Sequence, residues 1–195
     1  DLALEQLARD ARKAGATLIH SFPVVAVQEM ESGMVIHSAS GKKITAELVV
    51  IAAGAWSGAL LSWFEDKIIP VREQALWTKP VDCAVSGAIR AGYGYTNLRS
   101  SSEGGLLISG CRWATSHMEL GETDDSIVVD SIQTKLEDTF TRLYPEKKPP
   151  TVIARWAWLY ARTCDMLPIV GPLPGSPRII ACTGFVGNPY GLAIQ

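Results

Sequence analysis

The sequence predicts an α/β fold combined with an α+β region, and three features of the chain predict it. An apolar run at residues 48–53 ends at Gly54 and precedes a segment with helical character. A second junction of strand and glycines lies at residues 178–187. Between the two junctions, the chain reads as strands with one long helix. This order predicts one sheet that is interrupted by an antiparallel region.

Length and composition indicate a folded protein without a strong charge. The 195 residues, 47% hydrophobic and 19% charged, are enough for a sizeable core. The net charge of −2 provides no basic surface for nucleic acid or an anionic membrane. No apolar run reaches the roughly 20 residues that span a bilayer. The four cysteines and three histidines are dispersed, which predicts reduced thiols in the cytoplasm and no metal site.

Residues 1–64 predict a helix, a small group of strands and one buried strand. Leucine and alanine recur on one side of residues 2–13, and Gly15 is placed to end this helix. Four short segments that follow read as strands, namely residues 16–22, 23–27, 34–38 and 43–47. The apolar run 48–53 then predicts a parallel strand that is buried on both faces. Residues 55–64 are expected to be helical.

The middle of the chain predicts an antiparallel sheet backed by a helix. Residues 92–98 and 105–112 read as a pair of antiparallel strands. Residues 125–144 are the longest helix candidate, with an apolar stripe and with Thr123 or Asp124 as its cap. Three aromatic side chains alternate along the predicted strand 151–160, so they share one face: Trp156, Trp158 and Tyr160.

Three blocks of the chain resemble, in order and spacing, the FAD-dependent D-amino-acid-oxidase superfamily. They are LVVIAAGAWSG at 48–58, WAWLYARTCDMLPIVG at 156–171 and GFVGNPYGLA at 184–193. The chain is most similar to the group of glycine oxidase, the sarcosine oxidases and dimethylglycine dehydrogenase. The resemblance implies a discontinuous, Rossmann-like FAD-binding domain from residues 1–64 and 164–195. It also implies an antiparallel substrate domain at residues 65–163.

The same resemblance assigns residues to the cofactor. It implies that Val24 faces the adenine part of FAD, and that Ala53, Gly54 and Trp56 form the loop on the pyrophosphate and ribose side. A second set matches the segment that lines the isoalloxazine: Gly184, Phe185, Val186, Gly187, Asn188 and Leu192. For Val24 and Leu192 the alternative is core packing. The two glycine hinges, near residues 54 and 187, are expected to meet beneath one cofactor cleft.

Several positions depart from the family pattern. No G-x-G-x-x-G turn, which holds the FAD pyrophosphate in the family, occurs in the chain. We therefore expect a fragment that lacks an N-terminal segment and the end of its last helix. Pro189 replaces a usual glycine, and Gly191 stands where monomeric sarcosine oxidases place a carboxylate-binding lysine. Trp158 stands where those enzymes have a flavin-linking cysteine. Tyr160 matches their tyrosine, where glycine oxidases carry arginine, and favours secondary or tertiary amine substrates.

The predicted function is oxidation of the C–N bond of an amino acid or N-methylated amine of the sarcosine, dimethylglycine or glycine type. The flavin supplies the redox chemistry, and the protein orients the substrate and balances its charge. Tyr160 is the candidate catalytic residue, as an aromatic wall or hydroxyl contact, with a structural tyrosine as the alternative. Trp158, Arg99 and Arg162 are candidate substrate-binding residues, and Arg112 is a third available cation. Core packing or a surface charge is the alternative for each.

A second hypothesis belongs to a different class of protein. The chain is then a non-catalytic module, partial or degenerate, that holds no flavin. The expected truncation at both ends and Pro189 favour this interpretation. Flavin absorbance in the purified chain, or its absence after reconstitution, distinguishes the two hypotheses.

Overall fold

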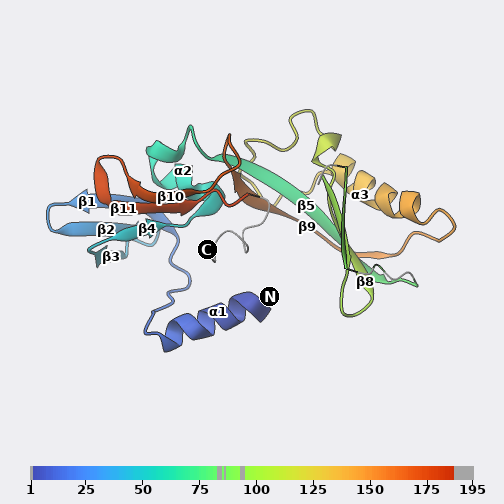
Figure 1. Cartoon of the computed structure of the whole chain (residues 1–195), viewed down its shortest axis with the longest axis horizontal. Helices are drawn as coiled ribbons and strands as arrows, with labels where there is room; N and C mark the ends of the chain where they lie inside the picture. The colour runs from blue at the N-terminus through green and yellow to red at the C-terminus, as the bar shows by residue number, and fades with distance from the viewer. Residues whose placement is uncertain (1, 83–84, 86, 93–94, 187–195) are drawn as a thin grey trace.

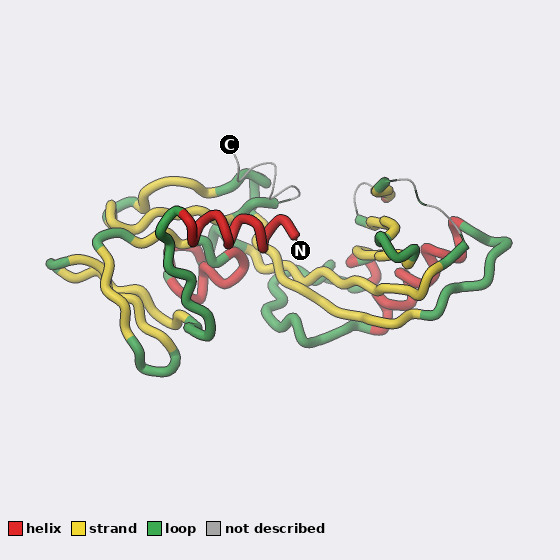
Figure 2. The backbone as a smooth tube through the Cα atoms, turned by 90° about the horizontal axis from the view of Figure 1, so that it is seen from below, coloured by secondary structure: helices red, strands yellow, loops and turns green. Residues whose placement is uncertain are grey.

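The computed structural model describes residues 2–82, 85, 87–92 and 95–186. It has two halves, which two long strands connect: β5 (Ile69–Pro80) and β9 (Val152–Arg162) (Figure 1). One half contains two three-stranded sheets, and the other contains a five-stranded antiparallel sheet with one long helix (Figures 1 and 2). The predicted combination of α/β and α+β structure is confirmed.

The first half begins with a helix and a three-stranded meander. Helix α1 (Leu2–Lys13) ends as predicted, just before Gly15, which adopts a φ of 95°. The meander has the order β1-β2-β3, with bounds β1 (Val24–Met30), β2 (Gly33–Ser38) and β3 (Lys43–Ala46). Three of the four short strands predicted here are therefore present.

The fourth, predicted at residues 16–22, is wrong. Leu18 and Ile19 are exposed, and Ser21 has a φ of 55°. A strand needs a neighbour that satisfies its backbone N–H and C=O groups. No strand within the described part of the chain pairs with this segment, which forms an irregular connection to β1.

A second sheet combines an antiparallel and a parallel pairing. Strands β10 (Ile169–Leu173) and β11 (Ser176–Thr183) form a hairpin, and β11 pairs in parallel with β4 (Val49–Ile51). The parallel strand predicted at 48–53 is therefore present in a shorter form. Its predicted burial on both faces is wrong, since Ile51 is 3% exposed and Val50 is 52% exposed. The hydrophobic cluster of this half packs on the face of Val49 and Ile51.

The segment predicted as helical at 55–64 forms three short helical turns. They are η1 (Gly54–Trp56), α2 (Ser57–Leu60) and η2 (Ser62–Phe64). The extended backbone of Leu61, at φ −144° and ψ 122°, interrupts the helix. Phe64 is fully buried and fixes the last turn in the core. The first turn, η1, contacts both β5 and β9, which places the end of β4 against the second half.

The second half is a curved sheet with one covered face. Its strand order is β6-β7-β8-β5-β9, with bounds β6 (Ala88–Ala91), β7 (Thr96–Ser100) and β8 (Gly105–Gly110). The pairing of β7 with β8 confirms the antiparallel pair predicted at 92–98 and 105–112. Helix α3 (Asp130–Leu143) covers one face through Ile132, Leu136 and Phe140, which are almost fully buried. We call this the closed face and the opposite one the open face.

Helix α3 is shorter than the predicted range 125–144, and neither predicted cap is used. The Asp124 carboxylate instead accepts hydrogen bonds from the N–H and hydroxyl of Ser126, at 2.9 and 2.6 Å, and closes a separate turn. The N–H of Val129, at the start of the helix, donates to the side-chain oxygen of Gln74 at 2.9 Å. Because Gln74 belongs to β5, it is a contact with the sheet that sets the first residue of this helix.

Candidate functional site

The ends of β4 and β11 lie side by side because these strands run parallel. The Thr183 hydroxyl donates to the carbonyl oxygen of Gly54 at 3.3 Å, and the Ser57 hydroxyl donates to the same oxygen at 2.8 Å. Both side chains are buried, and their hydroxyl oxygens are 3.1 Å apart. These contacts join the first glycine junction to the second, which continues into Gly184. The predicted hinge at Gly187 lies outside the described residues.

Gly54 and Gly184 both have a positive φ, but their surroundings differ. At Gly184, with φ 79°, a Cβ atom would lie 2.8 Å from the Thr163 side chain. Glycine is therefore required there so that the end of β11 packs on the end of β9. At Gly54, with φ 53°, a Cβ atom would meet nothing within 4 Å. The backbone of Gly54 is open to the approach of a ligand.

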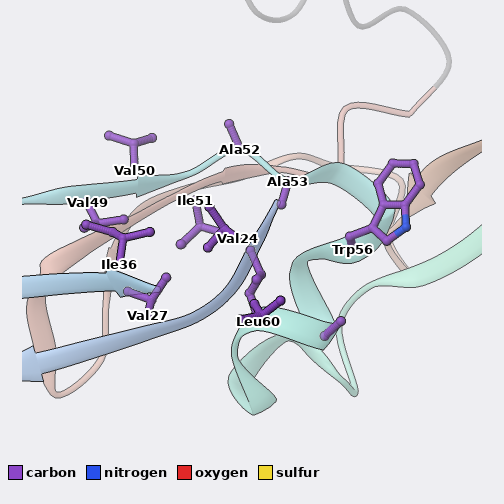
Figure 3. A pocket seen from close by; sticks show the side chains of 12 residues that line it. Val24, Val27, Ile36, Val49, Val50, Ile51, Ala52, Ala53, Trp56 and Leu60 are labelled. Atoms are coloured by element: carbon purple, nitrogen blue, oxygen red, sulfur yellow. The ribbon is translucent and has the colours of Figure 1, made fainter. Parts of the chain in front are cut away.

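An apolar cavity of about 720 Å³ lies beside this junction, between β1, β4 and α2 (Figure 3). Three residues predicted to hold the cofactor line it: Val24, Ala53 and Trp56. The other lining residues are all aliphatic: Val25, Val27, Ile36, Val49, Val50, Ile51, Ala52, Ala59 and Leu60. None of these lining residues carries a charge, so the cavity suits a flat apolar ring rather than a phosphate. The walls therefore fit the ring systems of FAD.

The residues predicted to line the isoalloxazine are only partly described. Gly184 is buried, and Phe185 and Val186 are half-buried just beyond the end of β11. Asn188 and Leu192, like Gly187, lie outside the described residues. The structure thus places the beginning of this segment next to Thr183 and the Gly54 junction.

The open face of the five-stranded sheet carries the predicted substrate residues. Trp158 lies opposite Glu73 in β5 and Tyr160 lies opposite Val71, so both aromatic rings project on this face together with Trp156. A pocket of about 420 Å³ on the face is lined by Trp156, Trp158, Arg90, Arg99, Asn97 and Ser109, among others. It brings Trp158 and Arg99 together. Tyr160 is outside its lining, and Arg162 is the last residue of β9, further along the same face.

Sequence analysis did not predict the cluster around Arg112, which follows β8. Arg112 is 6% exposed, and its Nε lies 3.4 Å from a carboxylate oxygen of Glu73. Its guanidinium carbon is 5.6 Å from the ring centre of Tyr95 and 5.8 Å from that of Tyr160. The alternation of β5 could have placed Glu73 on the open face. The approach of Arg112 to it depends on a loop with no local signal.

Burial changes the ionisation of two members of this cluster. Desolvation raises the pKa of Glu73, and the nearby Arg112 only partly opposes this shift. Desolvation also raises the pKa of Tyr160, with Arg112 again acting in the opposite direction. Tyr160 is therefore a neutral phenol at physiological pH, which can donate a hydrogen bond or present an apolar ring.

The described residues contain no group of three or more histidine, cysteine or acidic residues that could hold a metal ion. Nor does any helix in this part of the chain combine the length and apolar character needed to cross a membrane. Three of the cysteines are described, Cys111, Cys164 and Cys182, and all three are free thiols.

Comparison with known proteins gives a consistent result. The FAD-dependent oxidoreductase family, DAO, matches residues 1–194. A glycine oxidase of Pseudomonas putida is 30% identical over 169 residues, which are 86% of this chain and 44% of the relative. The crystal structure of glycine oxidase from Geobacillus kaustophilus superposes with a TM-score of 0.75 at 25% identity, covering 92% of this chain and 46% of that one.

The fold alone is shared more widely. L-proline dehydrogenase from P. horikoshii superposes with a TM-score of 0.76 at 22% identity, covering 95% of this chain and 50% of that one. The chain spans less than half the length of the glycine oxidases that it matches in sequence. Its match to the family nevertheless extends over almost every residue, and the family implies FAD as the cofactor. The predicted resemblance is confirmed: this chain belongs to the DAO family of FAD-dependent oxidoreductases.

Proposed function

We propose that this chain supplies part of an enzyme that uses FAD to oxidise the C–N bond of an amino acid or N-methylated amine of the glycine, sarcosine or dimethylglycine type. In this proposal residues 1–64 and 164–195 belong to the FAD-binding domain, and residues 65–163 form the substrate domain. The observation that carries the proposal is the packing of η1 against β9. This packing places the Gly54 loop next to the strand that presents Trp158 and Tyr160.

On the cofactor side, the proposal gives each described residue a simple role. Val24 faces the adenine part of FAD in the cavity of about 720 Å³, and Ala53, Gly54 and Trp56 form the loop on its pyrophosphate and ribose side, where Gly54 lets the cofactor approach the backbone. The isoalloxazine ring is lined by the segment that begins at Gly184 and includes Phe185, Val186, Gly187, Asn188 and Leu192. When bound, FAD supplies the acceptor for the electrons removed from the substrate.

On the substrate side, the open face orients the amine. Trp158 and Tyr160 provide an aromatic wall, and the neutral Tyr160 phenol is available as a hydrogen-bond donor. Arg99 and Arg162 lie on the same face and contribute positive charge toward an anionic substrate. We place the enzyme in the cytoplasm because the free thiols Cys111, Cys164 and Cys182 suit a reducing compartment.

The first test is whether the chain binds FAD through the apolar cavity. Ala53→Leu fills part of the cavity, and Ala16→Leu places the same side chain on the exposed segment before β1. We expect Ala53→Leu to weaken FAD affinity by about tenfold or more, equal to about 1.4 kcal/mol, and Ala16→Leu to leave it unchanged. Quenching of flavin fluorescence by the purified chain measures both dissociation constants.

The second test addresses the reaction. Glycine, sarcosine and dimethylglycine are added without oxygen to the flavin-loaded protein, and bleaching of the flavin absorbance reports electron transfer from the substrate. Bleaching by at least one of the three supports the proposed function. If the chain retains no flavin after reconstitution, it is the non-catalytic module of the second hypothesis. If flavin is retained but stays oxidised, the substrate class is wrong.

A further inference from the structure

The pocket of about 420 Å³ on the open face is a hollow between larger side chains. One row of paired residues crosses all five strands, and its members are Trp156, Ala75, Ser109, Asn97 and Arg90. Neighbouring strands lie about 4.8 Å apart, and the side chains of one row project on the same face. The small residues Ala75 and Ser109 therefore form the floor of the pocket, because the longer side chains of the row stand on either side of them.

The polar groups that line the pocket are available to a ligand. Ser109 is 8% exposed, and its hydroxyl makes no hydrogen bond within the part of the chain that the structure describes, so its oxygen is open to the pocket. Arg90 Nε donates to Asn97 Oδ1 at 3.0 Å, which leaves the amide nitrogen of Asn97 as a donor. Arg99 has no ion-pair partner among the described residues. Each of these groups can donate a hydrogen bond, so the pocket suits a ligand that carries an acceptor.

Two tryptophans form an aromatic wall of the pocket. Trp156 and Trp158 both line it, and both are half-buried. Indole rings present wide apolar surfaces, which favour stacked or edge-on contact with another aromatic ring. The volume lies within the range of pockets that hold organic ligands, about 300–1,000 Å³, and a methyl group would leave most of it unfilled. The wall and the volume together indicate a planar ring.

The pocket begins beside the candidate catalytic residue, Tyr160. Strand β9 leads from this sheet to the first half of the molecule (Figure 1), and successive side chains on one face of a strand are about 7 Å apart. Trp158 is the neighbour of Tyr160 on the open face, and Trp156 follows on the side away from the first half. A substituent of an amine that is bound at Tyr160 can therefore extend along β9 to the two tryptophans.

We propose that this pocket binds an aromatic ring carried by the amine substrate, and that the ring packs on Trp156 and Trp158. An acceptor group on the ring accepts hydrogen bonds from Ser109, Asn97 or Arg99. This assignment rests on the proposed amine oxidation. It extends the substrates beyond glycine, sarcosine and dimethylglycine to amines whose nitrogen carries a benzyl-like group.

The test uses neutral probes, which require neither flavin nor turnover. Benzamide has a planar ring and an acceptor, cyclohexanecarboxamide has the acceptor on a non-planar ring, and toluene has the planar ring without the acceptor. Ligand-observed NMR titration of the full chain measures their dissociation constants. Trp156→Leu removes part of the aromatic wall, and Trp113→Leu is its control, since Trp113 is exposed outside the lining. Ala88→Leu narrows the pocket, and Ala91→Leu is its control, since Ala91 is exposed on the same strand outside the lining.

Benzamide is expected to bind more tightly than the other two probes. Trp156→Leu weakens benzamide binding by about fivefold to tenfold, as expected for the loss of an aromatic contact. Ala88→Leu also weakens it, and both control variants bind like the wild type. Ser109→Ala weakens benzamide binding by about fivefold and leaves toluene binding unchanged, because it removes only a hydrogen-bonding group.

Three results would overturn the assignment. The first is that benzamide does not bind to the wild type. The second is equal affinity for benzamide and cyclohexanecarboxamide, since the pocket then has no preference for a planar ring. The third is benzamide binding that neither Trp156→Leu nor Ala88→Leu weakens, since the ring then binds elsewhere. If Trp156→Leu does not fold, Ala88→Leu and its control decide this point alone.

Bleaching of the flavin distinguishes this assignment from the proposed function. In the flavin-loaded protein, N-benzylglycine should bleach the flavin at a lower concentration than sarcosine, and Ala88→Leu should remove this advantage. If sarcosine bleaches the flavin and N-benzylglycine does not, the aromatic substituent is wrong while the proposed function stands. If no amine bleaches the flavin while benzamide binding still depends on Trp156, the pocket binds a ring and the proposed oxidation is wrong.

Discussion

The two faces of the five-stranded sheet each contain an arginine–glutamate pair with a buried arginine, and the two pairs use adjacent residues of β5. On the closed face, Arg72 Nε lies 2.6 Å from the Glu119 carboxylate. On the open face, Glu73 lies 3.4 Å from Arg112. Both partners come from the loop between β8 and α3. Because side chains alternate along a strand, one loop thus contacts both faces of the sheet at the same part of β5.

The pair on the closed face is embedded in a complete polar network. Arg72 is 3% exposed and Glu119 is 1% exposed. Gln74 donates to the same Glu119 carboxylate at 3.3 Å and accepts a hydrogen bond from Gln133 of α3 at 3.1 Å. Arg155 extends the network by donating to Gln133 at 2.8 Å. Every polar group has a partner within the fold, which is the arrangement expected of a structural element.

The comparison distinguishes an ion pair that stabilises the fold, on the closed face, from an ion pair on the face that carries the proposed substrate residues. On the closed face, the ion pair is short and α3 packs its apolar side chains against the sheet. On the open face, a longer ion pair borders two tyrosine rings and a pocket of about 420 Å³ lies along the same strands. Loss of a closed-face residue should therefore lower stability. Loss of an open-face residue should change ligand binding or titration and affect stability less.

The largest effect is expected from Glu119→Ala. This substitution leaves Arg72 buried without its main partner, and breaking a buried ion pair in this way costs about 3–5 kcal/mol of unfolding free energy. Urea unfolding measures the loss. Glu122→Ala is the control, because Glu122 also lies 3.4 Å from Arg72 but is partly exposed and should contribute at most about 1 kcal/mol. Equal losses for the two variants would show that the network does not depend on Glu119.

A second prediction compares apolar side chains on the two faces. Leu136→Ala creates a cavity between α3 and the sheet and should cost about 2–5 kcal/mol, since Leu136 is fully buried. Trp158→Ala removes a larger but half-buried side chain and should cost about 1 kcal/mol in the flavin-free protein. Both are measured by urea unfolding at the same pH. A loss for Trp158→Ala as large as that for Leu136→Ala would show that the open face is packed as a second core.

Features that depend on local pattern could be predicted from the sequence. The alternation of Trp156, Trp158 and Tyr160 predicts their shared face, and the register of β9 with β5 agrees. The apolar run before Gly54 predicts a parallel strand, and β4 pairs in parallel with β11. These features follow from the periodicity of the backbone, and the order of the residues in the sequence shows this periodicity directly.

Features that depend on distant contacts could not be predicted in this way. The start of α3 is set by Gln74, from strand β5, and not by a cap in the preceding residues. The Arg112–Glu73 pair requires that the loop after β8 turns back along the first part of β5, where Val71 and Leu120 form an isolated bridge. Neither contact has a local sequence signal, so each appears only once the sheet is assembled.

The smallest effect concerns the titration of Tyr160. Burial raises its pKa above the ordinary value, so its phenol ionises only at higher pH than in the unfolded chain. The folded state therefore binds this proton more tightly. The stability that it contributes is fully present below about pH 10 and is lost as pH rises through the folded pKa. Tyrosinate absorbance of the wild type, with Tyr160→Phe subtracted, measures the transition.

Charge changes on the two faces should move this titration differently. Glu73→Gln lowers the pKa of Tyr160, because a neighbouring negative charge is removed, and Arg112→Met raises it further, because a neighbouring positive charge is removed. Glu137→Gln, which alters the ion pair of Glu137 with Arg155, leaves it unchanged. A shift of the Tyr160 titration in Glu137→Gln as large as in Glu73→Gln would mean that the sheet does not separate its two faces electrostatically. The charged residues of the open face would then not be electrostatically separate from those of the closed face.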